Sequence, residues 1–151
     1  MDLKLTVTKE FTFDCAHILS YHEGLCSNLH GHTYRLEVTA SKNELINEGS
    51  SEGMILDFGD LKRIVKDLII DIFDHSFLFW ESGCDAEREI ADIIEKYGMR
   101  IVKLKDRPTA ENIAVFIINT LNEHLKDSPI NIVKVRLYET PTSYAEVKNY
   151  V

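Results

Sequence analysis

The sequence predicts an α+β fold in one domain spanning residues 1–151. Alternation of apolar and polar residues indicates strands near both ends of the chain, at roughly 3–17, 32–39, 131–139 and 144–150. Apolar side chains at helical spacing indicate three helices between them, at 61–73, 85–97 and 109–125. Strands, then helices, then strands are the pattern of an α+β protein.

The first two strands each carry a histidine on their apolar face. In the first strand, Phe13, Cys15 and His17 are two residues apart and share one face. In the second strand, His32 and Tyr34 share the apolar face in the same way. Both strands therefore direct a histidine toward the core side of the sheet.

The helices are bounded by recognisable signals. A short extended segment at 54–58 is expected to lead into the first helix, which ends near Phe73, directly before Asp74 and His75. Thr109 follows a proline and is a good N-cap for the last helix. The helix at 85–97 has the weakest apolar pattern of the three, because most of its residues are charged or polar.

Three histidines form a candidate metal site. His30 and His32 lie two apart in an extended segment, so both can face one ion, and His17 can supply a third nitrogen. Three protein nitrogens on zinc leave one tetrahedral position open, which is typical of catalytic sites. Cys15 shares the face of His17 and could close the site with a fourth ligand, but a small core side chain is the favoured interpretation.

Cys26, Asp74, His75 and Glu139 are further candidates. Cys26 could be a nucleophile, a proton carrier or the fourth zinc ligand, and its spacing leaves these open. Asp74 could orient His75 for proton transfer, although such pairs are more often caps or surface pairs. Glu139 ends the apolar row of the strand at 131–139, where it could accept two parallel hydrogen bonds from a guanidine-like edge, such as that of a pterin, or simply be solvated.

Composition limits the possible partners and location. A formal net charge of -8 gives no electrostatic reason to expect a nucleic acid partner. No apolar run approaches the length of a membrane span. The three cysteines are an odd number at unrelated spacings and no secretory signal precedes them, so a reducing, cytoplasmic location is expected.

Six motifs, in order along nearly the whole chain, carry a family resemblance: Phe13–His17, Cys26–His32, Asp57–Lys62, Asp74–His75, Pro108–Asn112 and Tyr138–Thr140. Together they resemble the 6-pyruvoyltetrahydropterin synthase superfamily. The resemblance implies a tunnelling fold, with a four-stranded antiparallel sheet covered by helices on one face. It also implies a homo-oligomer, in which trimers close a barrel that pairs into hexamers.

The resemblance assigns a role to each candidate: His17, His30 and His32 as Zn²⁺ ligands, Cys26, Asp74 and His75 as catalytic residues, and Glu139 and Thr109 as substrate-binding residues. In the family the Asp–His pair reaches the thiol from an adjacent subunit, so the active site would lie between subunits. Two features depart from the family pattern. Cys15 replaces the usual alanine or serine, and residues 80–105 form a longer segment, expected as an insertion that adds a helix and a strand.

The spacing between Cys26 and His30 resembles that of the bacterial and archaeal 6-carboxytetrahydropterin synthase branch (QueD), whereas Ser27 argues against the folate branch. This branch implies conversion of 7,8-dihydroneopterin triphosphate to 6-carboxy-5,6,7,8-tetrahydropterin, with release of acetaldehyde and triphosphate, in queuosine biosynthesis. The alternatives are triphosphate elimination to 6-pyruvoyltetrahydropterin, a non-catalytic pterin-binding zinc module and, last, a zinc hydrolase.

Overall fold

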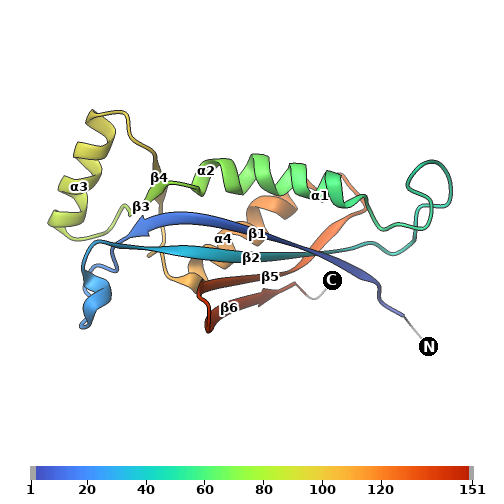
Figure 1. Ribbon diagram of the computed structural model, residues 1–151, viewed down its shortest axis with the longest axis horizontal. Helices are drawn as coiled ribbons and strands as arrows, with labels where there is room; N and C mark the ends of the chain where they lie inside the picture. The colour runs from blue at the N-terminus through green and yellow to red at the C-terminus, as the bar shows by residue number, and fades with distance from the viewer. Residues whose placement is uncertain (1–2, 150–151) are drawn as a thin grey trace.

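A computed structural model describes residues 3–149 as an α+β fold built on one six-stranded sheet (Figure 1). The strands are β1 (Thr6–His17), β2 (His30–Ser41), β3 (Ser76–Trp80), β4 (Ile101–Leu104), β5 (Asn131–Thr140) and β6 (Ser143–Lys148). The helices are α1 (Phe58–Val65), α2 (Asp71–Phe73), α3 (Asp85–Lys96) and α4 (Ala110–His124). A π-helical segment, Lys66–Ile70, joins α1 to α2, and a 3-10 turn spans Leu25–Ser27.

The sheet is mixed and has the strand order β4-β3-β1-β2-β5-β6. The pairs β1–β2, β2–β5 and β5–β6 are antiparallel, whereas β3 runs parallel to β1 and β4 parallel to β3. The expected four-stranded antiparallel sheet is therefore wrong, because β3 and β4 extend it past β1. The missed strand, β3, is a five-residue apolar run, which is too short to show a helical or strand period by itself.

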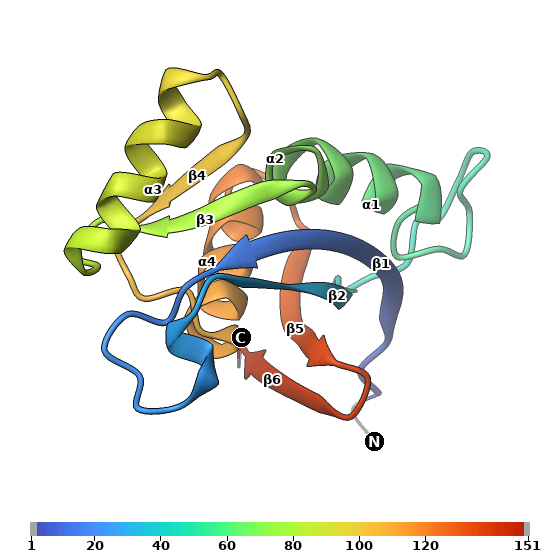
Figure 2. The ribbon, with the colours of Figure 1, turned by 60° about the vertical axis from the view of Figure 1, so that its left-hand side comes forward.

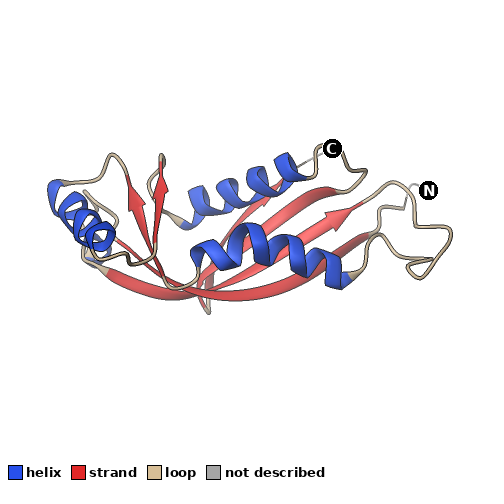
Figure 3. Cartoon of the chain, turned by 90° about the horizontal axis from the view of Figure 1, so that it is seen from above, coloured by secondary structure: helices blue, strands red, loops and turns tan. Residues whose placement is uncertain are grey.

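The helices cover one face of the sheet. Viewed from above, the helical run from α1 to α2 and helix α4 lie alongside each other over the long strands (Figure 3). Phe13 of β1 stacks on Tyr34 of β2 with ring centroids 5.2 Å apart, and Phe73 meets Phe13 edge-on at 5.8 Å. These side chains are almost fully buried, so the alternation in β1 and β2 does direct the apolar face to the core.

The caps of the first and last helices follow the chemistry of their sequences. The Asp57 carboxylate accepts a hydrogen bond from the backbone N–H of Gly59 at 2.6 Å, and α1 starts at Phe58. The expected extended segment at 54–58 is therefore wrong, because this cap allows helix to begin before the apolar period does. Thr109 is the N-cap of α4, as predicted, and its hydroxyl accepts from the N–H of Asn112 at 3.2 Å.

Two irregularities in β5 change which of its side chains are buried. The pairing with β2 shifts between Thr39 and Ala40, and this bulge turns Ile132 rather than Val133 into the core, beside Val135 and Leu137. Alternation in the sequence predicts one unbroken apolar row from Val133 to Glu139, and this prediction is wrong for Val133. A second shift, between Tyr138 and Thr140, leaves Glu139 outside the ladder with β6.

Helix α3 and strands β3 and β4 form one end of the molecule (Figure 2). There a small separate core joins Ile18, Phe77 and Ala91. Within residues 3–149, none of the helices combines the length and apolar character needed to cross a lipid bilayer.

Candidate metal and catalytic site

The three candidate metal ligands converge at one end of the β1–β2 ladder. His17 pairs with His30 across the ladder, and Cys15 pairs with His32, so all four side chains lie on the same face of the sheet. The nearest ring nitrogens of the three histidines lie within 4.8 Å of one another. Three neutral imidazoles at this separation can hold one divalent cation.

Backbone carbonyls orient two of these rings. His17 Nδ1 lies 2.9 Å from the carbonyl oxygen of Pro108, and His30 Nδ1 lies 2.7 Å from that of Asn28. A carbonyl oxygen only accepts, so each Nδ1 carries the proton and donates, and each Nε2 keeps its lone pair. The two Nε2 atoms are 3.1 Å apart.

This arrangement fits a metal cation. Two lone pairs that face each other at 3.1 Å repel unless a positive charge lies beside both. Protonation of His17 does not supply this charge near neutral pH, because burial lowers the pKa of its ring to about 4. His32 adds a buried Nε2 with no hydrogen-bond partner in the described chain, and burial lowers the pKa of this ring as well.

Cys15 is a core residue. Its side chain is buried, and burial, followed by the nearby carboxylates, raises the pKa of its thiol far above the usual value. Among the described residues, two groups here could hold an ion, one of His17, His30 and His32 and one of Asp14, Asp74 and His75, and Cys15 belongs to neither. The favoured interpretation of Cys15 as a small apolar side chain therefore agrees with the structure.

Cys26 lies in the 3-10 turn on the loop that connects His17 to His30. It is partly buried, and its carbonyl accepts a hydrogen bond from the N–H of Leu19 at 2.9 Å. Within one described chain, no hydrogen bond joins its thiol to Asp74 or His75.

Asp74 and His75 form a close pair at the start of β3. His75 Nδ1 lies 3.0 Å from Asp74 Oδ2, while the N–H of Asp14 donates to Asp74 Oδ1 at 2.9 Å. The pKa of Asp74 is lowered by that backbone hydrogen bond, and also by His75 and Arg100. His75 has a positive φ of 61°, and its own N–H donates to the carbonyl of Asp14 at 2.6 Å. Two backbone bonds therefore hold the pair against β1.

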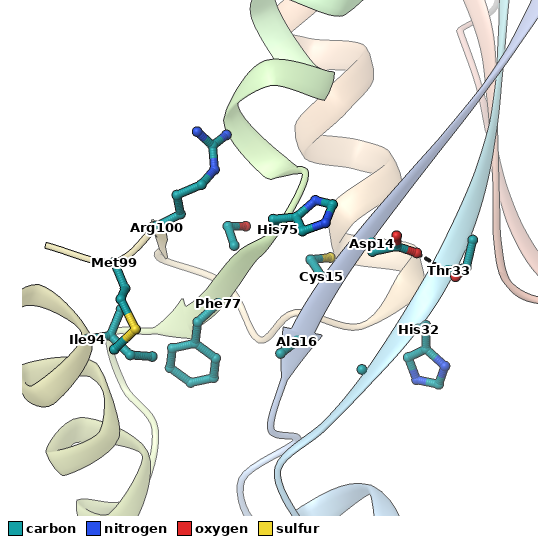
Figure 4. A pocket seen from close by; sticks show the side chains of 12 residues that line it. Asp14, Cys15, Ala16, His32, Thr33, His75, Phe77, Ile94, Met99 and Arg100 are labelled. Atoms are coloured by element: carbon teal, nitrogen blue, oxygen red, sulfur yellow. Dashed lines mark hydrogen bonds between the residues drawn. The ribbon is translucent and has the colours of Figure 1, made fainter. Parts of the chain in front are cut away.

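His75 borders an open cavity of about 560 Å³, which is lined by residues of β1, β2, the start of β3, α3 and the segment between α3 and β4. Figure 4 shows His75 projecting beside Asp14, which accepts a hydrogen bond from the Thr33 hydroxyl. Cys15 and His32 line the same cavity. The His75 side chain is 73% exposed, so in a single chain most of this ring faces solvent.

Glu139 lies beside the histidine cluster. Its Oε1 is 3.7 Å from His32 Nε2, and its side chain is only 23% exposed, so it is not the freely solvated strand end of the alternative interpretation. Glu139 and Thr109 line one cavity of about 320 Å³. Arg107 and His22, to which sequence analysis assigned no function, line it too. In the sequence, the only indication that Arg107 lies near the site is its position directly before the Pro108–Thr109 motif.

Comparison with known proteins places the chain in a family. The family model described as 6-pyruvoyl tetrahydropterin synthase matches residues 6–149. The chain belongs to the 6-pyruvoyl tetrahydropterin synthase family. The family resemblance inferred from the six motifs is thereby confirmed.

Within this family the chain is similar to proteins named 6-carboxy-5,6,7,8-tetrahydropterin synthase. The relative from Haemophilus influenzae is 44% identical over 140 residues, covering 93% of this chain and 96% of the relative. The relative from Aquifex aeolicus is 36% identical over 166 aligned positions and covers 97% and 99% of the two chains.

Solved structures of the family share the fold. An uncharacterised protein from Wolinella succinogenes superposes with a TM-score of 0.76 at 25% identity, covering 98% of this chain and 99% of the other. The 6-pyruvoyl tetrahydropterin synthase of Caenorhabditis elegans superposes with a TM-score of 0.67 at 22% identity, covering 98% and 97%. The second comparison supports the fold alone.

Proposed function

We propose that this member of the family is a zinc-dependent 6-carboxy-5,6,7,8-tetrahydropterin synthase of queuosine biosynthesis. It would convert 7,8-dihydroneopterin triphosphate to 6-carboxy-5,6,7,8-tetrahydropterin, with release of acetaldehyde and triphosphate. Similarity to relatives of that name supports the proposal. The structural observation that carries it is the histidine cluster. Backbone carbonyls free the Nε2 atoms of His17 and His30, and the Nε2 atom of His32 lies 3.7 Å from the half-buried Glu139.

His17, His30 and His32 would hold the Zn²⁺ ion, which supplies Lewis-acid polarisation of substrate hydroxyl groups when it is bound. The protein itself contributes by orienting the histidine rings before the ion binds. Carbonyl oxygens of Pro108 and Asn28 fix two of the rings before any ion arrives, and fixed ligands lower the cost of ordering the site.

Cys26, Asp74 and His75 would move protons between the substrate side chain and the pterin ring. The lowered pKa of Asp74 keeps its carboxylate ionised near neutral pH, so it can orient His75 and stabilise the protonated ring. The thiol of Cys26 would exchange a proton with this pair across a subunit boundary. The mostly exposed His75 supports a homo-oligomer, a trimer or hexamer, in which a second chain covers it.

Glu139 would bind the pterin ring by accepting two parallel hydrogen bonds from its N–H and amino group. Its place on the wall of the cavity of about 320 Å³, beside Thr109, supports this role for both residues. Because Glu139 also lies beside His32, a ring held there would have its side chain close to the histidine cluster.

The test is mass spectrometry of the products after the zinc-loaded protein has been incubated with 7,8-dihydroneopterin triphosphate, with Cys26→Ala as control. Carboxytetrahydropterin and acetaldehyde, lost in the control, would support the proposal. A 6-pyruvoyl product would move the chain to the sister activity. No turnover would favour a pterin-binding zinc module.

A further inference from the structure

The loop between His17 and Cys26 is held from outside the candidate site. The Leu19 N–H donates to the carbonyl of Cys26 at 2.9 Å, which closes this loop at its base. The Arg107 guanidinium donates through Nη2 to the carbonyl of Ser20 at 2.9 Å and to that of Leu19 at 3.4 Å. Arg107 therefore binds the carbonyl of Leu19, whose N–H anchors the Cys26 turn, and the carbonyl of Ser20, the next residue.

The segment from β3 to α3 binds the same loop. The Cys84 N–H donates to Ser20 Oγ at 3.1 Å, and the Ser20 hydroxyl lies 3.2 Å from Cys84 Sγ. Tyr21 has a positive φ of 71°, and its ring meets Trp80 edge-on at 6.1 Å. These contacts come from a part of the chain that has no residue in the histidine cluster.

Glu87 lies in the first turn of α3, behind these contacts. Its side chain is fully buried, and neither carboxylate oxygen has a hydrogen-bond partner among the described residues. Burial raises the pKa of Glu87 to about 7, and the positive charge of Arg107 opposes this rise. Arg107 Nε is likewise buried without a partner.

The turn before α3 is shaped to admit this carboxylate. A Cβ added at Gly83 would lie 1.9 Å from Glu87 Oε2 and 3.0 Å from the carbonyl oxygen of Trp80. The N–H of Gly83 donates to that carbonyl at 2.9 Å, which fixes the turn. A buried, unpaired carboxylate is unfavourable for folding, so its presence here suggests a task other than stability.

We propose that Glu87, Ser20 and Arg107 are positioning residues for Cys26. Glu87 packs against the Gly83 turn, and the Cys84 N–H that follows this turn binds Ser20. Arg107 binds the Leu19–Ser20 backbone of the loop that leads to the thiol. This inference rests on the proposed catalytic role of Cys26. It gives the segment from Trp80 to Arg107 a function in the site, because its side chains and backbone determine where the thiol lies relative to the metal ligands.

Glu87 is the residue to change, since its full burial keeps it away from any substrate, whereas Arg107 lines the Glu139 cavity. Glu87→Leu removes both oxygens at similar volume, and Glu87→Gln keeps the shape and an acceptor. Ser20→Ala removes the hydroxyl that accepts from Cys84 without adding volume. Glu89→Leu makes the same chemical change at an exposed position of α3 and is the matched control.

Two measurements separate positioning from general damage. The first is steady-state kinetics on the zinc-loaded enzyme. The second is the rate of Cys26 alkylation by iodoacetamide, followed by peptide mass spectrometry, together with zinc content. We expect Glu87→Leu and Ser20→Ala to lower kcat by roughly tenfold or more and to change the alkylation rate of Cys26, with KM and zinc content nearly unchanged. Glu87→Gln should restore most of kcat.

Unchanged kcat and alkylation rate in both Glu87→Leu and Ser20→Ala would overturn the proposal, as would an equal effect of Glu89→Leu. If Glu87→Leu does not fold, Ser20→Ala and Glu87→Gln still decide the question. An active Cys26→Ala enzyme, or a wild-type protein without turnover, would contradict the proposed function. The alkylation rates would still test whether Glu87 and Ser20 control the position of the thiol.

Discussion

His17 and His30 face each other with their Nε2 atoms 3.1 Å apart, while the Nδ1 atom of each lies against a backbone carbonyl. We therefore expect His17→Ala, His30→Ala and His32→Ala each to reduce bound zinc to less than roughly a tenth of the wild-type content, because two nitrogens do not complete a catalytic zinc site. Inductively coupled plasma mass spectrometry of the purified proteins measures this. His124→Ala, at the end of α4, is the control and should keep its zinc.

If the active site lies between subunits, Cys26→Ala and His75→Ala should each be inactive alone and should complement each other. Chains of the two variants would be co-expressed with different tags, and mixed oligomers isolated by tandem affinity. Random pairing would then place an intact thiol beside an intact imidazole in roughly a quarter of the sites, and activity should recover accordingly. Mixed oligomers that stay inactive would show that both groups act within one chain.

Glu139→Gln should weaken binding of the pterin ring, because an amide offers one acceptor where a carboxylate offers two charged ones. The expected loss in affinity for 7,8-dihydroneopterin is roughly 10- to 100-fold, in line with about 1.5–3 kcal/mol for a hydrogen bond to a charged group. Isothermal titration calorimetry measures it. Glu111→Gln, a first-turn residue of α4 on the wall of the same cavity, is the control for a general change in charge.

Glu87→Gln should stabilise the protein at high pH relative to the wild type. The pKa of Glu87 is raised to about 7 from 4.5, so the folded state binds the proton more tightly than the unfolded state. The wild type therefore loses stability as the pH rises from about 4.5 to 7, and glutamine does not share this loss. The difference in unfolding free energy should grow by up to about 3 kcal/mol between pH 5 and pH 8.

Urea denaturation of both proteins, followed by circular dichroism at the two pH values, measures this difference. A constant difference between pH 5 and pH 8 would mean that Glu87 titrates as it does in the unfolded chain. Lower activity in Glu87→Leu together with higher stability in Glu87→Gln at high pH would be the signature of a residue kept for function at the expense of stability.

Much of the fold could be read from periodicity. The alternation of β1 and β2 directed Phe13, His17, His32 and Tyr34 to the core side, and the structure buries or half-buries all four. The apolar spacing located α3, α4 and the helical run that ends at Phe73. The predictions failed where a strand was short or irregular. Strand β3 has no period long enough to detect, and the bulge in β5 exchanged Val133 for Ile132 in the core.

By itself, the sequence determined which side chains share a strand face and which residue types could hold an ion, because period and chemistry are local properties. Only the tertiary structure decided the partners. Pro108 reaches His17 from 91 residues away, β3 pairs with β1 across the sheet, and the Cys84 N–H binds Ser20 from 64 residues away. Such contacts depend on how the helices and strands pack, and no local pattern encodes which carbonyl or carboxylate will meet a given ring.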